Sequence, residues 1–175
     1  MELERIGRVL QAMKERGLSQ MIVCDPQSID YLTGVYVAPF ERLFALYLRA
    51  DGNHVFFLNK LFTVPETPLE KVWFSDTDDS IGMIAQRIQA GEPLGIDKEW
   101  TARFLLPLME RLPGTSFQLA SDCVDSVRAR KDAAEQELMR MNSRLNDEAM
   151  TRAVAYIREG MTERQVANFL MAQYK

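Results

Sequence analysis

Apolar residues recur along this chain at two spacings, and the alternation of those spacings predicts an α/β protein. A continuous apolar run at residues 20–24 is typical of a strand covered on both faces, and residues 71–74, 94–96 and 116–120 are also expected to form strands. Apolar positions three or four residues apart, which predict amphipathic helices, occupy residues 3–16, 26–32, 80–90 and 101–112. Pro107 marks a kink or a restart in the last of these helices.

Turn and cap residues place one antiparallel hairpin in the middle of this pattern. Asp51-Gly52 separates two apolar segments, residues 44–49 and 54–58, and is the strongest short-range hairpin signal in the chain. Asp25-Pro26 is typical of an N-cap followed by the first residue of a helix. Strands that alternate with helices around one hairpin predict a mixed sheet of roughly six strands with helices on both faces.

The last third of the chain predicts a pair of helices. Asp132 with Glu135, and Thr162 with Gln165, have the spacing of a capping box, and Gly160 between them fits the end of a helix. The apolar positions expected to face inward on these two helices are Ala134, Leu138, Met141, Leu145, Ala149, Ala153, Val166, Phe169 and Leu170.

These patterns divide the chain into two parts. We expect an α/β domain over residues 1–125, and a linker with the first helices of a second, truncated domain over residues 126–175. An apolar helix pair needs a surface to bury against, and little sequence remains to supply one. We therefore expect the natural protein to continue beyond residue 175.

Composition narrows the class of protein. The chain is 47% hydrophobic and 26% charged, as in an ordinary soluble globular protein, and its net charge of -4 gives no support to a nucleic-acid or anionic-membrane partner. No apolar run approaches the ~20 residues that span a bilayer. The first residues lack a signal-peptide pattern, and Cys24 and Cys123 lie far apart without a Cys-x-x-Cys motif. We expect a cytoplasmic protein.

The residue inventory argues against a metal site in this chain. A catalytic zinc site needs about three protein ligands, usually with histidine among them, and His54 is the only histidine. Because His54 follows the hairpin turn, we interpret it as a surface residue. Asp76, Asp78 and Asp79 lack the spacing of a calcium loop and are interpreted as the solvated, acidic start of a helix.

Nucleophilic and phosphate chemistry also lack their motifs. No Gly-x-Ser-x-Gly occurs, neither Cys24 nor Cys123 has a nearby histidine to activate it, and no glycine-rich loop follows a strand. Cys24 ends an apolar run and is interpreted as a buried thiol. The 175-residue chain by itself is therefore expected to be inactive.

One loop carries candidate site residues. Pro39, Phe40, Glu41 and Arg42 lie between a short helix and the hairpin, and they place an aromatic ring beside an acid–base pair, as loops that contact ligands often do. The alternative is structural, with Phe40 in the core while Glu41 and Arg42 pair in solvent.

The junction between the two parts resembles that of the creatinase/prolidase family of metallopeptidases. The pattern is Arg-x-x-Lys-Asp-x-x-Glu, a long helix, then Gly-x-Thr-Glu-x-x-Val-Ala. The matching residues are Arg128, Lys131, Asp132, Glu135, Gly160, Thr162, Glu163, Val166 and Ala167. In that family this junction joins an N-terminal α/β domain to a catalytic "pita-bread" domain, and the looser resemblance covers the whole chain.

The resemblance implies an accessory domain of an Xaa-Pro dipeptidase-like enzyme. Members of the family hold two divalent metal ions (Mn, Co or Zn) with two Asp, one His and two Glu, all expected beyond residue 175. It further implies a homodimer and a short peptide substrate. Dimerisation and restriction of substrate size are the expected roles of this domain.

The family resemblance also bears on the loop. Bacterial members often read Asp-Pro-His-Glu-Arg where this chain reads Ala38-Pro39-Phe40-Glu41-Arg42, and their loop reaches toward the neighbouring subunit's active site. Phenylalanine in place of histidine removes a titratable group and indicates a more apolar substrate. We expect Phe40 and Arg42 to help close the partner's active site, with Arg42 facing a substrate carboxylate.

A different class of function is also open. Some pita-bread relatives have lost their metals and act as interaction proteins. This chain could likewise be a non-catalytic binding or assembly module, in which a partner covers the apolar face of the last helices.

Overall fold

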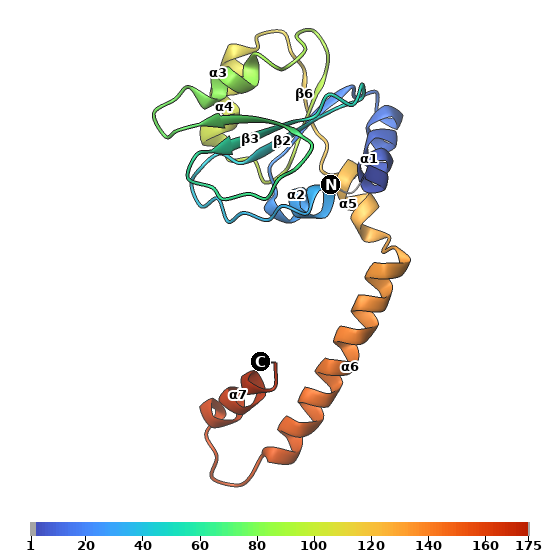
Figure 1. Cartoon of the computed structure of the whole chain (residues 1–175), viewed down its shortest axis with the longest axis vertical. Coiled ribbons are helices and arrows are strands. Elements are labelled where there is room, and N and C mark those ends of the chain that lie inside the picture. Colours follow the sequence, from blue (N-terminus) through green and yellow to red (C-terminus); the bar gives the residue numbers. More distant parts are fainter. Residues whose placement is uncertain (1–2, 175) are drawn as a thin grey trace. The chain divides into compact units, whose positions relative to one another are not determined.

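The computed structural model describes residues 3–174, so the end of the expected second part, Lys175, lies outside the described residues (Figure 1). Contacts divide the chain into two units, Met1–Ala129 and Arg130–Lys175. The boundary expected at residues 125/126 falls inside helix α5 (Asp122–Ala129), which packs with the first unit. The two units are described separately.

Within residues 3–174, the first unit is built on a six-stranded mixed sheet in the order β4-β3-β2-β1-β5-β6. The strands are β1 (Gln20–Val23), β2 (Ala45–Arg49), β3 (Val55–Asn59), β4 (Glu70–Phe74), β5 (Leu94–Ile96) and β6 (Phe117–Leu119). Strand β2 pairs antiparallel with β1 and with β3, and the other neighbours pair in parallel. The predicted hairpin is therefore β2–β3.

Helices cover both faces of this sheet, as predicted (Figure 1). Helices α1 (Leu3–Glu15), α2 (Pro26–Thr33) and α5 share one apolar cluster with the sheet, and α3 (Ser80–Ala85) and α4 (Ala102–Arg111) share the other. Alternate residues of β2 enter opposite clusters, with Leu46 and Leu48 on one face and Ala45 and Tyr47 on the other. This period of two is what a fully covered strand requires.

Local signals explain where α2 begins and ends. The Asp25 carboxylate accepts hydrogen bonds from the backbone N–H groups of Gln27 and Ser28, and Pro26 occupies the first turn. Gly34 ends the helix at a φ of 72°, a conformation that glycine adopts without a steric penalty. The helix thus delivers the chain to the candidate loop in a defined direction.

Three features differ from the sequence prediction. Helix α3 ends at Ala85 and does not extend toward residue 90, and α4 runs without interruption through Pro107. His54 is half-buried, and its Nδ1 accepts a hydrogen bond from the Arg49 N–H at 3.2 Å. Burial lowers the pKa of His54, which is thus only partly exposed and not a fully solvated surface residue.

The second unit contains α6 (Ala133–Tyr156) and α7 (Glu163–Ala172), and both predicted capping boxes are formed. The ring of Tyr156 stacks on that of Phe169 with centroids 3.9 Å apart. Of the inward positions predicted on α6, Ala149 and Ala153 are buried, whereas Leu138, Met141 and Leu145 are exposed. In residues 3–174, no helix is both long and apolar enough to cross a bilayer.

Candidate functional site

The four candidate loop residues form a tight turn ahead of β2. The N–H of Arg42 donates to the carbonyl of Pro39 at 2.9 Å, which closes the turn. Phe40, at its second position, has a φ of 52°. A positive φ at this position is that of a type I′ or II′ turn, for which glycine is the favoured residue.

Phe40 is therefore an aromatic residue in a conformation that suits glycine. Its side chain is 87% exposed, so the alternative that placed Phe40 in the core was wrong. The ring adds no core packing to offset the strained backbone. A strained residue that persists without a packing benefit points to a functional role.

Arg42 is fixed from the side by a carboxylate distant in the sequence. Its Nε lies 3.1 and 3.2 Å from the two carboxylate oxygens of Asp76, and its Nη2 lies 3.1 Å from Oδ2. Its Nη1 lies 3.2 Å from Oε1 of Glu41. The pairing of Glu41 with Arg42 foreseen from the sequence is present, but Asp76 is the stronger partner because two nitrogens share its carboxylate.

Two further side chains support this arrangement. Asn59, at the end of β3 and 2% exposed, donates from Nδ2 to Oδ1 of Asp76 at 2.7 Å. The Asn59 oxygen in turn accepts from the N–H of Leu61 at 2.9 Å, which fixes the amide. Arg103 of α4 donates to the carbonyl of Glu41 at 3.3 Å. The turn is thus tied to the sheet and to a helix.

The hydrogen bonds between Arg42 and Asp76 shift the pKa values of both groups. The hydrogen bond from Arg42, and then that from Asn59, lowers the pKa of the Asp76 carboxyl below 3.8. The same bond to Asp76 raises the pKa of Arg42. Both groups are fully ionised at neutral pH, and the pair is an exposed charge-assisted contact.

Two cavities flank this turn. One, of about 320 Å³, is polar and includes Asp76, Asp78 and Ser75 in its lining. The other, of about 430 Å³, lies on the side of Phe40 and Trp100 and is more apolar. Arg42 and Arg103 line both cavities. The arrangement can receive a ligand that combines an anionic group with an apolar part.

The acidic run after β4 has separate local roles. Asp79 caps α3 by accepting from the N–H of Gly82 at 3.0 Å, and Asp78 accepts from the N–H of Ser75 at 2.6 Å. Asp76 points instead to Arg42. In the part of the chain described here, no three His, Cys, Asp or Glu side chains are grouped to hold a metal ion. The donors present therefore do not fit a metal centre.

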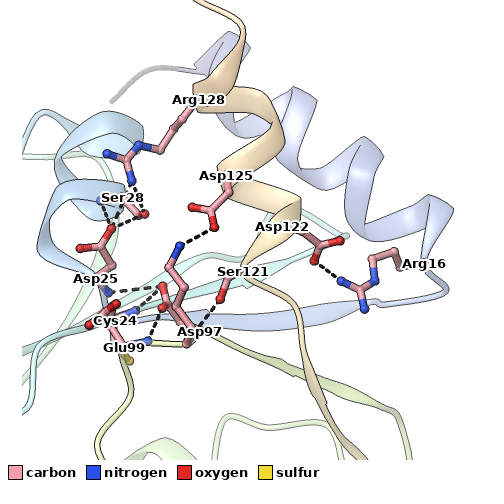
Figure 2. Close-up of polar contacts among 11 residues, drawn as sticks. Arg16, Cys24, Asp25, Ser28, Asp97, Glu99, Ser121, Asp122, Asp125 and Arg128 are labelled. Atoms are coloured by element: carbon pink, nitrogen blue, oxygen red, sulfur yellow. Dashed lines mark hydrogen bonds and ion pairs between the residues drawn. The ribbon is translucent and has the colours of Figure 1, made fainter.

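A second polar cluster lies where β1 and β5 end (Figure 2). Asp97, which is buried, accepts from the N–H groups of Cys24 and Asp25 at 3.4 and 3.3 Å. Arg128 of α5 reaches Asp25 at 3.2 Å (Figure 2), and Lys98 reaches Asp125 at 2.5 Å. These bonds tie α5 to the ends of the strands.

Cys24 is not an activated nucleophile in this cluster. Burial, followed by the nearby carboxylates of Asp97 and Asp25, raises the pKa of its thiol well above 9.0. The thiolate is the reactive form, so a raised pKa disfavours the reactive form of Cys24. The cluster is structural.

Sequence reasoning singled out the loop residues Pro39 to Arg42 but did not predict the side chains that hold the turn, which are Asn59, Asp76 and Arg103. Asp76 was interpreted only as part of an acidic helix start, and nothing in local spacing links it to Arg42. Asn59 did carry a signal, because it is a polar residue that directly follows four apolar residues of a buried strand. Buried amides are normally engaged in hydrogen bonds.

Comparison with known proteins places this fold among peptidase domains. The family model of the creatinase/prolidase N-terminal domain matches residues 5–130. A protein of Staphylococcus aureus strain MSSA476, described as an uncharacterized peptidase, is 27% identical over 173 residues that cover 96% of this chain and 48% of that relative. The chain thus spans about half the length of the curated relatives it matches.

Solved structures agree with the family match. Dipeptidase PepE of Mycobacterium ulcerans superposes with a TM-score of 0.84 at 26% identity, covering 98% of this chain and 49% of that one. A prolidase of Thermococcus sibiricus gives a TM-score of 0.85 at 23% identity, covering 100% of this chain and 50% of that one. At 23% identity, the similarity to the Thermococcus sibiricus prolidase shows only that the fold is shared.

Proposed function

Because the chain belongs to the creatinase/prolidase N-terminal domain family, we propose that it serves as the accessory domain of an Xaa-Pro dipeptidase-like metallopeptidase. Its role in this proposal is to restrict the substrate and to support a homodimer. The turn at Pro39–Arg42 reaches the active site of the partner subunit, where Phe40 and Arg42 contact the substrate.

One observation carries this proposal: an exposed aromatic residue in a strained conformation stands beside a fixed arginine. Phe40 is 87% exposed at a φ of 52°, and Arg42 is held by Asp76. Neither feature adds to the core of the first unit. The exposed, strained Phe40 and the fixed Arg42 are both typical of a surface that binds a ligand.

The chemistry of hydrolysis belongs to another part of the proposed enzyme. A centre with two divalent ions (Mn, Co or Zn) would activate water for attack on the peptide bond. Residues 3–174 contain no group of side chains suited to hold such ions, so no step of the reaction is assigned to them. The contribution proposed for this chain is to bind the substrate and to exclude peptides that are too long.

Arg42 is the residue assigned to a substrate carboxylate. A guanidinium binds a carboxylate through two parallel N–H···O bonds, which gives both charge and orientation. In a dipeptide the C-terminal carboxylate lies one residue from the scissile bond, so a fixed arginine would select short peptides over long ones. Phe40 would favour an apolar residue beside that carboxylate.

The test uses the complete protein and a matched pair of substrates. Arg42→Ala should lower kcat/KM for alanyl-proline by about 10- to 100-fold, in line with about 1.5–3 kcal/mol for a charge-assisted hydrogen bond. The same variant should leave hydrolysis of alanyl-proline amide almost unchanged. Arg87→Ala, which removes an exposed arginine paired with Glu70 elsewhere on the surface, is the control.

A rival function is favoured by one observation. Leu138, Met141 and Leu145 are exposed on α6, which suits a helix that a partner protein covers. An unchanged kcat/KM in Arg42→Ala would exclude the substrate-contact role. A complete protein that cleaves no peptide would instead favour an assembly module.

A further inference from the structure

The guanidinium of Arg42 offers two edges for carboxylates, and its intramolecular partners use them unequally. Asp76 takes the side edge, with Nε at 3.1 and 3.2 Å and Nη2 at 3.1 Å from its oxygens. Among residues 3–174, the contact recorded at the end edge, formed by Nη1 and Nη2, is with the Glu41 carboxylate, at 3.2 Å from Nη1. A guanidinium can hold one carboxylate on each of these edges, because its five N–H groups point in fixed directions.

Asp76 is held more firmly than Glu41. Its Oδ1 accepts at 2.7 Å from the amide of Asn59, whose residue is 2% exposed and whose own oxygen is bonded to the N–H of Leu61. The Glu41 side chain is 63% exposed and adjoins Arg42 in the chain. Exposed ion pairs of this kind contribute about 0–1 kcal/mol, so the Glu41 carboxylate is readily replaced by another.

We propose that Asp76 is a positioning residue that fixes the side edge of Arg42 and presents its end edge to the carboxylate of a peptide ligand. Glu41 is the internal carboxylate that this ligand displaces. The inference rests on the proposed function, and it adds two roles that sequence analysis did not assign: Asp76 orients the arginine, and Glu41 competes with the ligand.

The surroundings define the class of ligand. Arg42 lines a cavity of about 430 Å³ whose lining also includes Pro39, Phe40 and Trp100. An apolar side chain or a proline ring next to the carboxylate would bury apolar area there. We therefore expect short peptides with an apolar C-terminal residue to bind, and peptides with an acidic one to be repelled by Glu41.

The orientation of Arg42 can be observed directly in the 175-residue chain. A bonded arginine Nε–H gives a distinct, slowly exchanging signal in a ¹H–¹⁵N spectrum. Asp76→Asn should abolish that signal for Arg42, whereas Glu41→Gln should leave it in place. Asp51→Asn is the matched control, because Asp51 accepts from the Nε of Arg49 at 3.1 Å elsewhere on the surface.

The KM and kcat of the complete protein distinguish a positioning role of Asp76 from a purely structural one. Asp76→Asn should raise KM for alanyl-proline about 5- to 20-fold with kcat nearly constant, and Glu41→Gln should lower KM about 2- to 5-fold. Adding Asp76→Asn to Arg42→Ala should have little further effect, since a positioning residue acts only through its target. Asp51→Asn should change neither constant.

Several outcomes would overturn the inference. One is a higher KM in Glu41→Gln, another is additive losses in the double variant, and a third is an Arg42 signal that survives Asp76→Asn. If the wild-type complete protein cleaves no Xaa-Pro dipeptide, the proposed function fails. The positioning role of Asp76 is then tested by the ¹H–¹⁵N spectra alone. If Asp51→Asn removes the Arg42 Nε–H signal as fully as Asp76→Asn does, the loss is not specific to Asp76, and the positioning role is contradicted.

Discussion

At the scale of single residues, the turn at Pro39–Arg42 holds an exposed residue in a strained backbone conformation. A side chain at a positive φ costs of order 1–3 kcal/mol, and Phe40 recovers little of it because the ring is 87% exposed. Natural proteins keep such residues where binding needs them. The caps at Asp25, Asp132 and Thr162 could be predicted because each depends on neighbours in sequence. The exposure of Phe40 could not, because it depends on a backbone angle.

Replacing Phe40 tests whether its backbone conformation lowers the stability of the first unit. Phe40→Gly should stabilise the first unit by about 1 kcal/mol, since relief of strain exceeds the ~0.4–1 kcal/mol that added freedom of the unfolded chain costs. Phe40→Ala keeps the strained backbone and should leave stability nearly unchanged. Urea unfolding followed by tryptophan fluorescence measures both, because Trp73 and Trp100 lie in this unit. A loss of stability in Phe40→Gly would show that the ring packs.

At the scale of elements, apolar spacing located the strands and most of the helices because each buries one face or both. The helix α5 escaped prediction because it is short and commits mainly Cys123 and Val124 to the core. The sheet also requires close approach at one point. A Cβ on Gly95 of β5 would lie 2.9 Å from the Cβ of Ala120 and 3.1 Å from Met21. Spacing along the chain does not reveal such a contact.

The close approach at Gly95 predicts that a single methyl group added there lowers the stability of the first unit. Gly95→Ala should destabilise the first unit by about 1–2 kcal/mol, because overpacking of about 1–3 kcal/mol exceeds the gain from a less flexible unfolded chain. Gly7→Ala is the matched control, since within residues 3–174 its added Cβ in α1 meets no atom within 4 Å apart from its chain neighbours and the backbone of its own helix. That variant should stabilise by about 0.5–1 kcal/mol. Equal effects of the two variants in urea unfolding would contradict the packing argument.

At the scale of the whole molecule, the proposed site depends on contacts between distant segments. Asn59, Asp76 and Arg103 come from two strand ends and a helix, and they converge on a turn that begins at Pro39. The fold class and the turn could be predicted from the sequence, the turn with help from a family resemblance. The supports of Arg42 could not, because folding alone brings them together.

The most direct test of the account is hydrolysis of alanyl-proline by the complete product of the gene, with and without divalent metal ions. We expect the complete protein to hold its metal ions with two Asp, one His and two Glu that lie outside residues 3–174. We also expect it to cleave this dipeptide only when metal is present. A complete, folded protein that leaves alanyl-proline intact in Mn²⁺, Co²⁺ and Zn²⁺ would contradict the proposed peptidase function.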